Sequence, residues 1–247
     1  MASTPRTVVL LPTYNERENI GTIVPQIRAV ANVDVMILDD NSPDGTGKVA
    51  DELALSDSRV CVIHRPKKEG LGRAYLDGMR RALDENYDLI IEMDADFSHP
   101  PQLLPRLITA ASEVDLVLGS RNVTGGGTKN WPLWRRLLSK SGSFYARSLL
   151  GVDVQDLTGG YKCFRRIVLE NIDLNSIHSN GYAFQIETTY RALMHGFRVL
   201  EIPFIFVERA CGQSKMSQKI FFEAIMMCPY LRFTQIIHPR SGSLSFL

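Results

Sequence analysis

Short apolar runs alternate with amphipathic stretches along the first half of the chain. Five runs rich in Val, Ile and Leu show little polar alternation, which is typical of strands buried on both faces of a sheet. These strands are predicted at residues 8–11, 35–38, 60–63, 89–93 and 116–118. Helical periodicity fills the intervals, over residues 16–30, 47–55, 71–83 and 102–112. The alternation predicts an α/β fold with a central, mostly parallel sheet flanked by helices.

The second half of the chain is less regular. A glycine triplet at 125–127 precedes a long segment, residues 131–150, in which aromatic and basic residues are mixed. Strand-like runs at 161–164 and 199–207 flank a helix predicted near 184–195. Because no repeat or low-complexity linker divides the chain, we expect a single domain over residues 1–247 with a variable C-terminal portion.

Composition excludes several classes of protein. The net charge of +1 gives no basic excess for binding nucleic acid. The four cysteines are scattered without a C-x-x-C pair, which favours a reduced, cytosolic chain. No signal peptide is evident, and the apolar tail at 220–233 is interrupted by Glu223, Pro229 and Arg232. We therefore expect a protein that does not span a membrane but can lie on one.

Polar clusters follow three of the predicted strands, at residues 12–16, 39–45 and 94–100. The carboxyl ends of parallel strands meet at one edge of a sheet, so these clusters are expected to converge on one crevice. A G-x-G-x-x-G motif is missing after the first strand, which argues against a Rossmann dinucleotide site.

Asp94 and Asp96 are the first candidates for chemistry. Two carboxylates alternating across Ala95 after a buried strand can face a common Mg²⁺ or Mn²⁺, since both ions prefer oxygen ligands. Such an ion would stabilise a pyrophosphate leaving group. The alternative is a solvated turn, but the preceding strand and His99 with its two following prolines favour the metal site.

The two other clusters suit a nucleotide. Tyr14 can pack against a base, while Glu16 and Asp40 can accept hydrogen bonds from a base or ribose. Glu16 could instead only complement the helix dipole. Asp44 is interpreted as part of the turn and cap before the next helix. The G-L-G sequence at 70–72 either lets a ligand approach the backbone or opens a helix, and both interpretations stay open.

Three basic residues are candidate phosphate ligands. Arg209 and Lys215 flank a glycine-containing loop that could close over a phosphate, and Arg121 directly follows the fifth strand. The alternative is a solvated basic surface, which is the usual setting of a lone lysine.

Several long motifs in fixed order give the chain a specific resemblance. They are LLPTYNE at 10–16, DDNSPDGT at 39–46, GLG at 70–72, MDAD at 93–96, SHP at 98–100, GSR at 119–121, DLTGG at 156–160, GYAFQ at 181–185, VER at 207–209 and GQSK at 212–215. Together they resemble glycosyltransferase family 2 with its GT-A fold, and within it the dolichol (polyprenol) phosphate mannosyltransferases. The resemblance covers residues 7–216, nearly the whole chain.

The resemblance implies a role for each matching residue. The guanosine half of GDP-mannose would be lined by Pro12, Tyr14, Glu16, Leu38 and Asp40. Asp94, Ala95 and Asp96 would meet the ribose, pyrophosphate and metal, with Asp96 the firmest metal ligand. Arg121, Arg209 and Lys215 would bind donor and acceptor phosphates. Some relatives carry Gln where this chain has Ser98, a weaker ligand, so water would complete the metal shell here.

The resemblance also implies the reaction and its setting. Residues 1–120 would bind the nucleotide sugar, and residues 121–247 would bind the acceptor and face the membrane. A polyprenyl phosphate acceptor is already an anion near neutral pH, because the second pKa of a phosphate monoester is about 6. It needs positioning more than deprotonation, which predicts one inverting displacement at the sugar C1 with GDP as leaving group. The Q-x-x-R-W signature of processive members does not occur.

The expected location is peripheral, on the cytosolic face of a membrane, with a small membrane-anchoring subunit as a further expected partner. The aromatic and basic residues of segment 131–150 suit an interfacial helix, although burial against the sheet is an alternative. Three other functions stay open: the same chemistry with another donor such as UDP-glucose, a nucleotidyltransferase, and a catalytically silent nucleotide-sugar-binding module.

Overall fold

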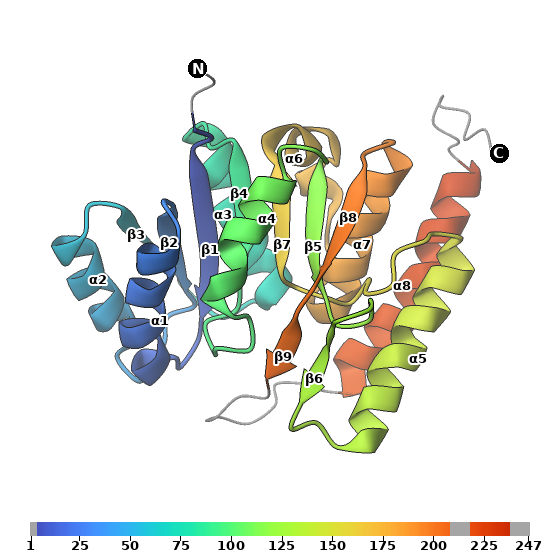
Figure 1. Cartoon of the computed structure of the whole chain (residues 1–247), viewed down its shortest axis with the longest axis horizontal. Helices are drawn as coiled ribbons and strands as arrows, with labels where there is room; N and C mark the ends of the chain where they lie inside the picture. The colour runs from blue at the N-terminus through green and yellow to red at the C-terminus, as the bar shows by residue number, and fades with distance from the viewer. Residues whose placement is uncertain (1–3, 208–217, 238–247) are drawn as a thin grey trace.

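Seven strands form the central sheet of the computed structural model, which describes residues 4–207 and 218–237 (Figure 1). The strands are β1 (Thr7–Thr13), β2 (Asp34–Asp39), β3 (Val60–His64), β4 (Leu89–Glu92), β5 (Leu116–Ser120), β7 (Lys162–Arg165) and β8 (Val199–Pro203). Their spatial order is β3-β2-β1-β4-β7-β5-β8, and β7 runs antiparallel to both of its neighbours. The other pairings are parallel, which confirms the predicted α/β class.

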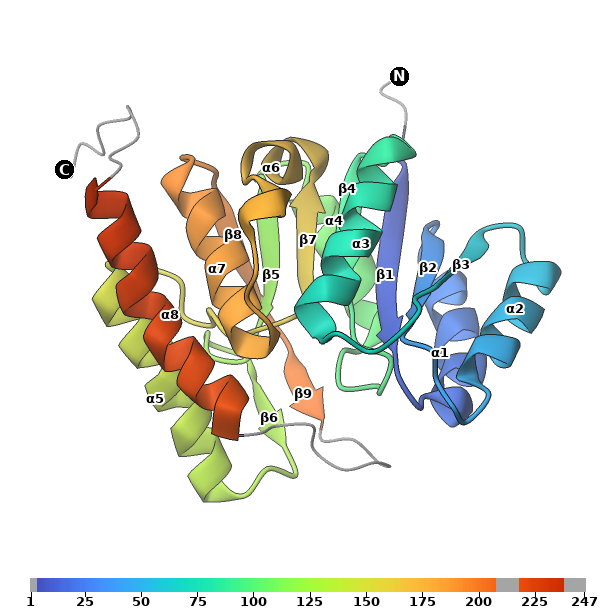
Figure 2. The ribbon, with the colours of Figure 1, turned by 180° about the vertical axis from the view of Figure 1, so that it is seen from behind.

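Helices cover both faces of this sheet. They are α1 (Arg17–Val30), α2 (Thr46–Ser56), α3 (Leu71–Asp84), α4 (Leu104–Ala110), α5 (Leu133–Leu150), α6 (Arg166–Asn171), α7 (Gly181–Met194) and α8 (Gln218–Ile237). Alternate residues of β1 face opposite sides: Val9 and Leu11 join the core with α1 and α4, and Val8 and Leu10 join the core with α3 and α7. Figures 1 and 2 show these two layers from opposite sides.

Two predicted elements are split in the structure. The helix predicted over 102–112 is a short 3₁₀ turn, Pro101–Leu103, followed by α4, because Pro105 has no N–H and suits only the first turn of a helix. The strand-like run at 199–207 forms β8 and then β9 (Ile205–Val207), which pairs with β6 (Gly127–Lys129) in a second sheet. Pro203 ends β8, and its missing N–H explains the break.

Glycines at the start of α3 allow that helix to approach the segment before α7. A Cβ at Gly72 would lie 2.5 Å from the carbonyl oxygen of Ser179, and one at Gly70 would lie 2.6 Å from Asn180 Oδ1. Gly70 also has φ +103°, which L-residues rarely adopt. Residues 70–72 therefore open a helix, which is one of their two interpretations, and close packing explains both glycines. Gly70 also lines the cavity described below, so the other interpretation, approach of a ligand to the backbone, stays open.

The helices α5 and α8 lie side by side at one end of the sheet (Figures 1 and 2). Ala146 and Leu150 of α5 and Cys228 and Leu231 of α8 join the core, and Tyr145 Oη donates to the carbonyl oxygen of Ile225 at 3.1 Å. Both helices also expose large apolar side chains to solvent: Leu133, Trp134, Leu137, Phe144, Tyr145, Leu149, Met226, Tyr230 and Phe233. Within residues 4–207 and 218–237, no helix has the length and apolarity needed to cross a bilayer.

Candidate active site

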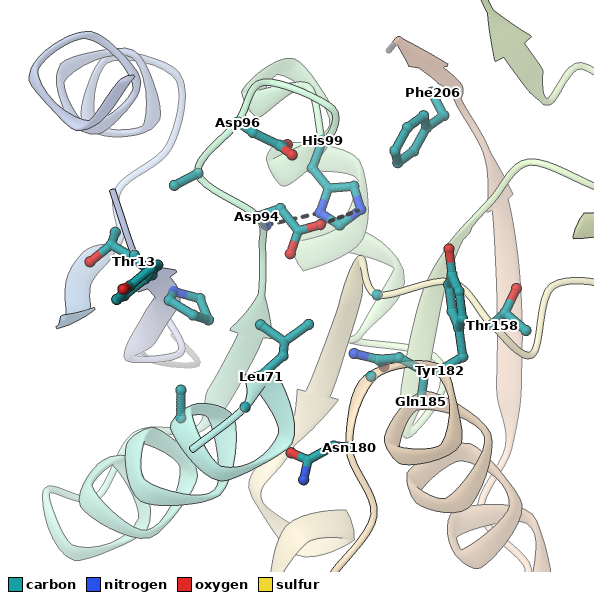
Figure 3. Close-up of a pocket in the computed structure, with 18 of the residues that line it drawn as sticks. Thr13, Leu71, Asp94, Asp96, His99, Thr158, Asn180, Tyr182, Gln185 and Phe206 are labelled. Atoms are coloured by element: carbon teal, nitrogen blue, oxygen red, sulfur yellow. Dashed lines mark hydrogen bonds and ion pairs between the residues drawn. The ribbon is translucent and has the colours of Figure 1, made fainter. Parts of the chain in front are cut away.

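A cavity of about 420 Å³ opens beyond the carboxyl ends of the central strands, where the polar clusters were expected to meet (Figure 3). It brings together most of the predicted site residues: Pro12, Tyr14, Glu16, Asp40, Asp94, Ala95, Asp96 and Arg121. Leu38 does not line it, because its side chain points into the core, where its Cδ1 would lie 2.8 Å from a Cβ at Gly78. Arg209 and Lys215 lie outside the described residues.

The loop after β4 holds the two candidate metal ligands in a tight turn. The backbone N–H of Ser98 donates to Asp96 Oδ1 at 3.0 Å, and that of Asp94 donates to His99 Nδ1 at 3.0 Å. Phe97 between them has φ +63°, a left-handed conformation. The His99 ring stacks on Tyr161 at 4.7 Å. Burial lowers the pKa of His99, which agrees with a neutral ring that accepts at Nδ1.

The residues of this turn fit a divalent cation that takes some of its ligands from the protein and the others from a bound substrate. Asp94 and Asp96 both line the cavity, and Asp96 is 5% exposed. Among the described residues, no group of three or more His, Cys, Asp or Glu side chains could hold a metal ion alone. The pair therefore matches the mode in which Mg²⁺ or Mn²⁺ takes one or two carboxylates and completes its shell with phosphate oxygens and water. Ser98 Oγ is buried and has no partner among those residues.

The end of the cavity that contains Asp40 is organised by Arg65, which sequence reasoning missed. Arg65 is 4% exposed and forms ion pairs with Asp40 and, at 2.8 Å, with Asp77. Burial raises the pKa of Asp40, and the neighbouring Arg65 opposes that shift. Arg65 holds Asp40 at the cavity edge. Its position directly after the third strand is the sequence signal that could have identified it.

The remaining acids of this end have separate roles. Asp44 Oδ1 accepts hydrogen bonds from Thr46 N and Oγ1 at 2.9 and 2.6 Å, which confirms its predicted structural role. Burial opposes ionisation of Asp44, but the bonds from Thr46 outweigh it and lower the pKa. Glu16 accepts a bond from Asn19 Nδ2 at 2.7 Å. The Tyr14 ring lies 3.9 Å from Lys68 Nζ, a cation–π contact at the edge of the cavity.

Arg121 enters the cavity already paired. Its Nε and Nη2 donate to Asp156 at 2.8 and 2.6 Å, and Nη2 also donates to Thr158 Oγ1 at 3.0 Å. Asp156 is fully buried; burial alone would raise its pKa, but the charge of Arg121 prevails and lowers it. Two of the three guanidinium nitrogens of Arg121 therefore donate to Asp156. Asp156 lies in the DLTGG motif, but sequence reasoning gave it no role.

A second cavity, of about 290 Å³, lies between α5 and α8 and is lined mainly by apolar side chains such as Leu138, Ile186 and Ile225. It meets the first cavity at four shared residues: Trp131, Arg135, Thr158 and Tyr182. The Arg135 guanidinium stacks over the Trp131 ring at 4.2 Å. Sequence reasoning had placed Arg135 only among the basic residues of segment 131–150, so its place at this junction is new.

Comparisons with known proteins agree with this geometry. The chain is 52% identical over 226 residues to a polyprenol monophosphomannose synthase of Mycolicibacterium smegmatis, covering 90% of this chain and 85% of the relative. It is 47% identical over 222 residues to an undecaprenyl-phosphate mannosyltransferase of Micrococcus luteus, covering 90% and 91%.

Solved structures with low sequence identity share the fold. A mannosyltransferase from Pyrobaculum calidifontis in complex with GDP-Man and Mn²⁺ has a TM-score of 0.59 at 17% identity, over 98% of this chain and 77% of that one. A glucosyl-3-phosphoglycerate synthase from Mycobacterium tuberculosis has a TM-score of 0.64 at 18% identity, over 91% and 80%. The family model "Glycosyl transferase family 2" matches residues 8–173, two thirds of the chain. The chain thus belongs to glycosyl transferase family 2 and is a glycosyltransferase of the GT-A fold.

Proposed function

We propose that this protein transfers mannose from GDP-mannose to the phosphate of a polyprenyl phosphate, with inversion at C1 and release of GDP. The observation that carries the proposal is the junction at Arg135, where the first cavity, which holds the charged side chains of Asp94 and Asp96, meets the apolar groove between α5 and α8. A nucleotide sugar needs the first space, and an isoprenoid chain needs the second. A water-soluble acceptor would have no apolar chain to occupy this groove.

The names of the two relatives reported above support mannose as the sugar and a polyprenyl phosphate as the acceptor. The Pyrobaculum calidifontis neighbour, solved with GDP-Man and Mn²⁺, supports a guanosine donor and a divalent cation, here Mg²⁺ or Mn²⁺. Pro12, Tyr14, Glu16 and Asp40 would contact the guanosine half, and Asp94 and Asp96 would hold the cation. When bound, the cation would compensate the charge that develops on the diphosphate leaving group.

The acceptor requires no general base in this scheme. A phosphate monoester with a second pKa of about 6 is largely dianionic at neutral pH, so its oxygen can attack C1 directly. Arg135 lies at the junction of the two cavities and supplies a guanidinium for that phosphate, and Arg121 also lines the first cavity. Arg209 and Lys215 stay proposed as further phosphate ligands. These cations hold the two substrates in line, which is where most of the rate enhancement would arise.

The decisive experiment measures transfer of radiolabel from GDP-[³H]mannose to undecaprenyl phosphate, scored in the organic phase with Mg²⁺ or Mn²⁺ and with EDTA. We expect metal-dependent labelling of the lipid and release of GDP. If UDP-[³H]glucose labelled the lipid instead, the donor would be UDP-glucose. Release of pyrophosphate would indicate a nucleotidyltransferase. Binding of GDP-mannose without transfer to any polyprenyl phosphate would leave only a nucleotide-sugar-binding module.

Exposed apolar residues on α5 predict attachment to a membrane surface. The side chains of Trp134, Leu137 and Phe144 are 64%, 60% and 63% exposed, and Arg136 and Lys140 lie on the same helix. Replacing the three apolar residues together by Ser is expected to weaken cosedimentation with anionic liposomes at least tenfold, since each buried apolar side chain contributes of order 1 kcal/mol.

The matched control changes three exposed residues of α2, a helix at the opposite end of the sheet. It replaces Glu52 and Leu55 by Ser and Ser56 by Ala. It should leave liposome binding unchanged. Unchanged cosedimentation of the α5 variant would contradict the membrane role of this helix, and the α5 face would then need another explanation.

A further inference from the structure

A proline inside α8 leaves one backbone carbonyl of that helix without its usual donor. Pro229 lies within α8, and proline has no N–H. The carbonyl group that this N–H would serve lies four residues earlier, at Ile225. Tyr145 of α5 takes the place of the missing donor, since its Oη donates to the carbonyl oxygen of Ile225 at 3.1 Å. A side chain of one helix therefore supplies the hydrogen bond that the other helix lacks.

This hydrogen bond lies on the apolar groove between the two helices. Tyr145 and Ile225 both line the second cavity, as does Cys228, and Tyr145 is 38% exposed. Because the donor and the acceptor both belong to the wall of the groove, the bond fixes α8 relative to α5 at the groove itself.

Much of the remaining contact between α5 and α8 is apolar. Ala146 and Leu150 of α5 and Cys228 and Leu231 of α8 join the core. Another hydrogen bond between the helices, from Arg232 Nη1 to the carbonyl oxygen of Leu150, is long, at 3.5 Å. Apolar packing has no preferred direction, so by itself it allows one helix to shift along the other. The bond from Tyr145 has a stricter geometry and therefore selects one arrangement of the two helices.

The position of α8 also affects the junction of the two cavities. Glu223 Oε1 accepts a hydrogen bond from the backbone N–H of Asn180 at 2.9 Å, just before α7 begins at Gly181. Asn180 and Gly181 line the first cavity, and the next residue, Tyr182, lines both cavities. A shift of α8 would therefore change the groove and disturb the junction where the acceptor phosphate would lie.

We propose that Tyr145 and Pro229 are positioning residues for the acceptor: together they fix α8 against α5 in the arrangement that admits the isoprenoid chain. This proposal rests on the proposed function and deepens it, since it concerns the acceptor that the groove would hold. Pro229 leaves free a carbonyl group that a regular helix would satisfy internally, and Tyr145 binds it. The pair should therefore govern the use of the lipid acceptor, and binding of the nucleotide sugar should not depend on it.

The test measures kcat/KM for undecaprenyl phosphate in detergent micelles and the Kd of GDP-mannose by calorimetry with Mn²⁺. For Tyr145→Phe, which keeps the ring, we expect kcat/KM to fall about fivefold, as for one lost hydrogen bond, and the Kd to stay within about twofold. In the Pro229→Ala background the restored N–H can serve Ile225, so Tyr145→Phe should change kcat/KM by less than about twofold. If Pro229→Ala does not fold, Pro229→Gln restores the same N–H.

Two matched controls separate this effect from a general loss of hydrogen bonds or prolines. Tyr87→Phe also removes a tyrosine hydroxyl, which donates to Asp34 Oδ2 at 2.8 Å. Tyr87 precedes β4, at the end of the sheet opposite the first cavity, so kcat/KM for the lipid should stay within about twofold. Pro25→Ala replaces a proline inside α1 and should not rescue Tyr145→Phe.

Equal effects of Tyr145→Phe in the wild-type and Pro229→Ala backgrounds would show that the hydroxyl does not act through the carbonyl group of Ile225. An unchanged kcat/KM for Tyr145→Phe would show that the bond does not position the acceptor. A parallel weakening of GDP-mannose binding would show a general effect on the fold. A wild type that transfers mannose to no polyprenyl phosphate would instead refute the proposed function itself.

Discussion

Replacing Asp96 by Asn is expected to lower kcat/KM for mannosyl transfer by at least about 10³-fold, equivalent to about 4 kcal/mol of transition-state stabilisation. The substitution removes the charge that would hold the divalent cation against the diphosphate. It preserves the shape of the side chain and the Oδ1 acceptor that receives the Ser98 N–H at 3.0 Å. Radiolabel transfer into lipid measures the effect, and thermal unfolding checks that the fold is retained.

The matched control for this variant is Asp51→Asn on α2. Asp51 is also an aspartate with a partner, but its side chain is 54% exposed and pairs with the exposed His64 at 2.8 Å. Surface ion pairs of this kind contribute little to stability, so the rate of mannosyl transfer should stay within about twofold of the wild type. If Asp96→Asn retained more than a tenth of wild-type turnover, the assignment of the metal to the turn after β4 would be wrong.

Replacing Asp156 by Ala is expected to destabilise the fold by about 3–5 kcal/mol, because it leaves the buried charge of Arg121 without its partner. Asp156 is fully buried and accepts hydrogen bonds from Arg121 N, Nε and Nη2, so few waters can replace it. The loss is a large fraction of the 5–15 kcal/mol that is typical of a whole domain. Urea denaturation of the variant and the wild type measures the difference.

A double variant separates the charge effect from simple loss of packing. Arg121→Met combined with Asp156→Leu removes both charges and keeps the volume, so it should be more stable than Asp156→Ala alone. If the double variant were as unstable as the single one, an uncompensated Arg121 would not be the cause.

The ion pair of Arg121 and Asp156 also makes the stability of the fold depend on pH in the acid range. The pKa of Asp156 is lower in the folded protein than in the unfolded chain, so its stabilising contribution is complete above about pH 5, where the unfolded aspartate is almost fully ionised. That contribution decreases as the pH falls through the lowered folded pKa. Stability measured between pH 5 and pH 2 should therefore drop for the wild type with a component that Asp156→Ala lacks.

The sequence was sufficient where local pattern and burial agree. The five apolar runs of the first half, each three to five residues long, all form strands. Four of these strands are buried inside the sheet, as their Val, Ile and Leu content predicted, while β3 at the edge is only partly buried. Parallel pairing then places the ends of β1, β2 and β4 at one edge of the sheet, and this placed Tyr14, Asp40 and Asp94 on a common cavity. The motifs likewise indicated the family that the comparisons confirm.

Other features depended on contacts between distant segments. Sequence reasoning placed Leu38 at the nucleotide, but its side chain is buried in the core and does not line the cavity. Both faces of β2 are buried, so its apolar run gives no sign of which residue reaches the cavity. Arg65 and Asp156 are an ordinary arginine and aspartate in the sequence. Their importance arises because each is buried against a partner 25 or more residues away.

By itself, then, the sequence determined the α/β class, the order of the strands along the chain and the metal-binding pair Asp94 and Asp96 as a prediction, since each follows from local periodicity and short spacing. Only the tertiary structure decided that Arg121 is paired to Asp156 and that Arg135 joins the first cavity to the apolar groove. Partners and solvent exposure are set by packing between segments far apart in the chain, which no local pattern encodes.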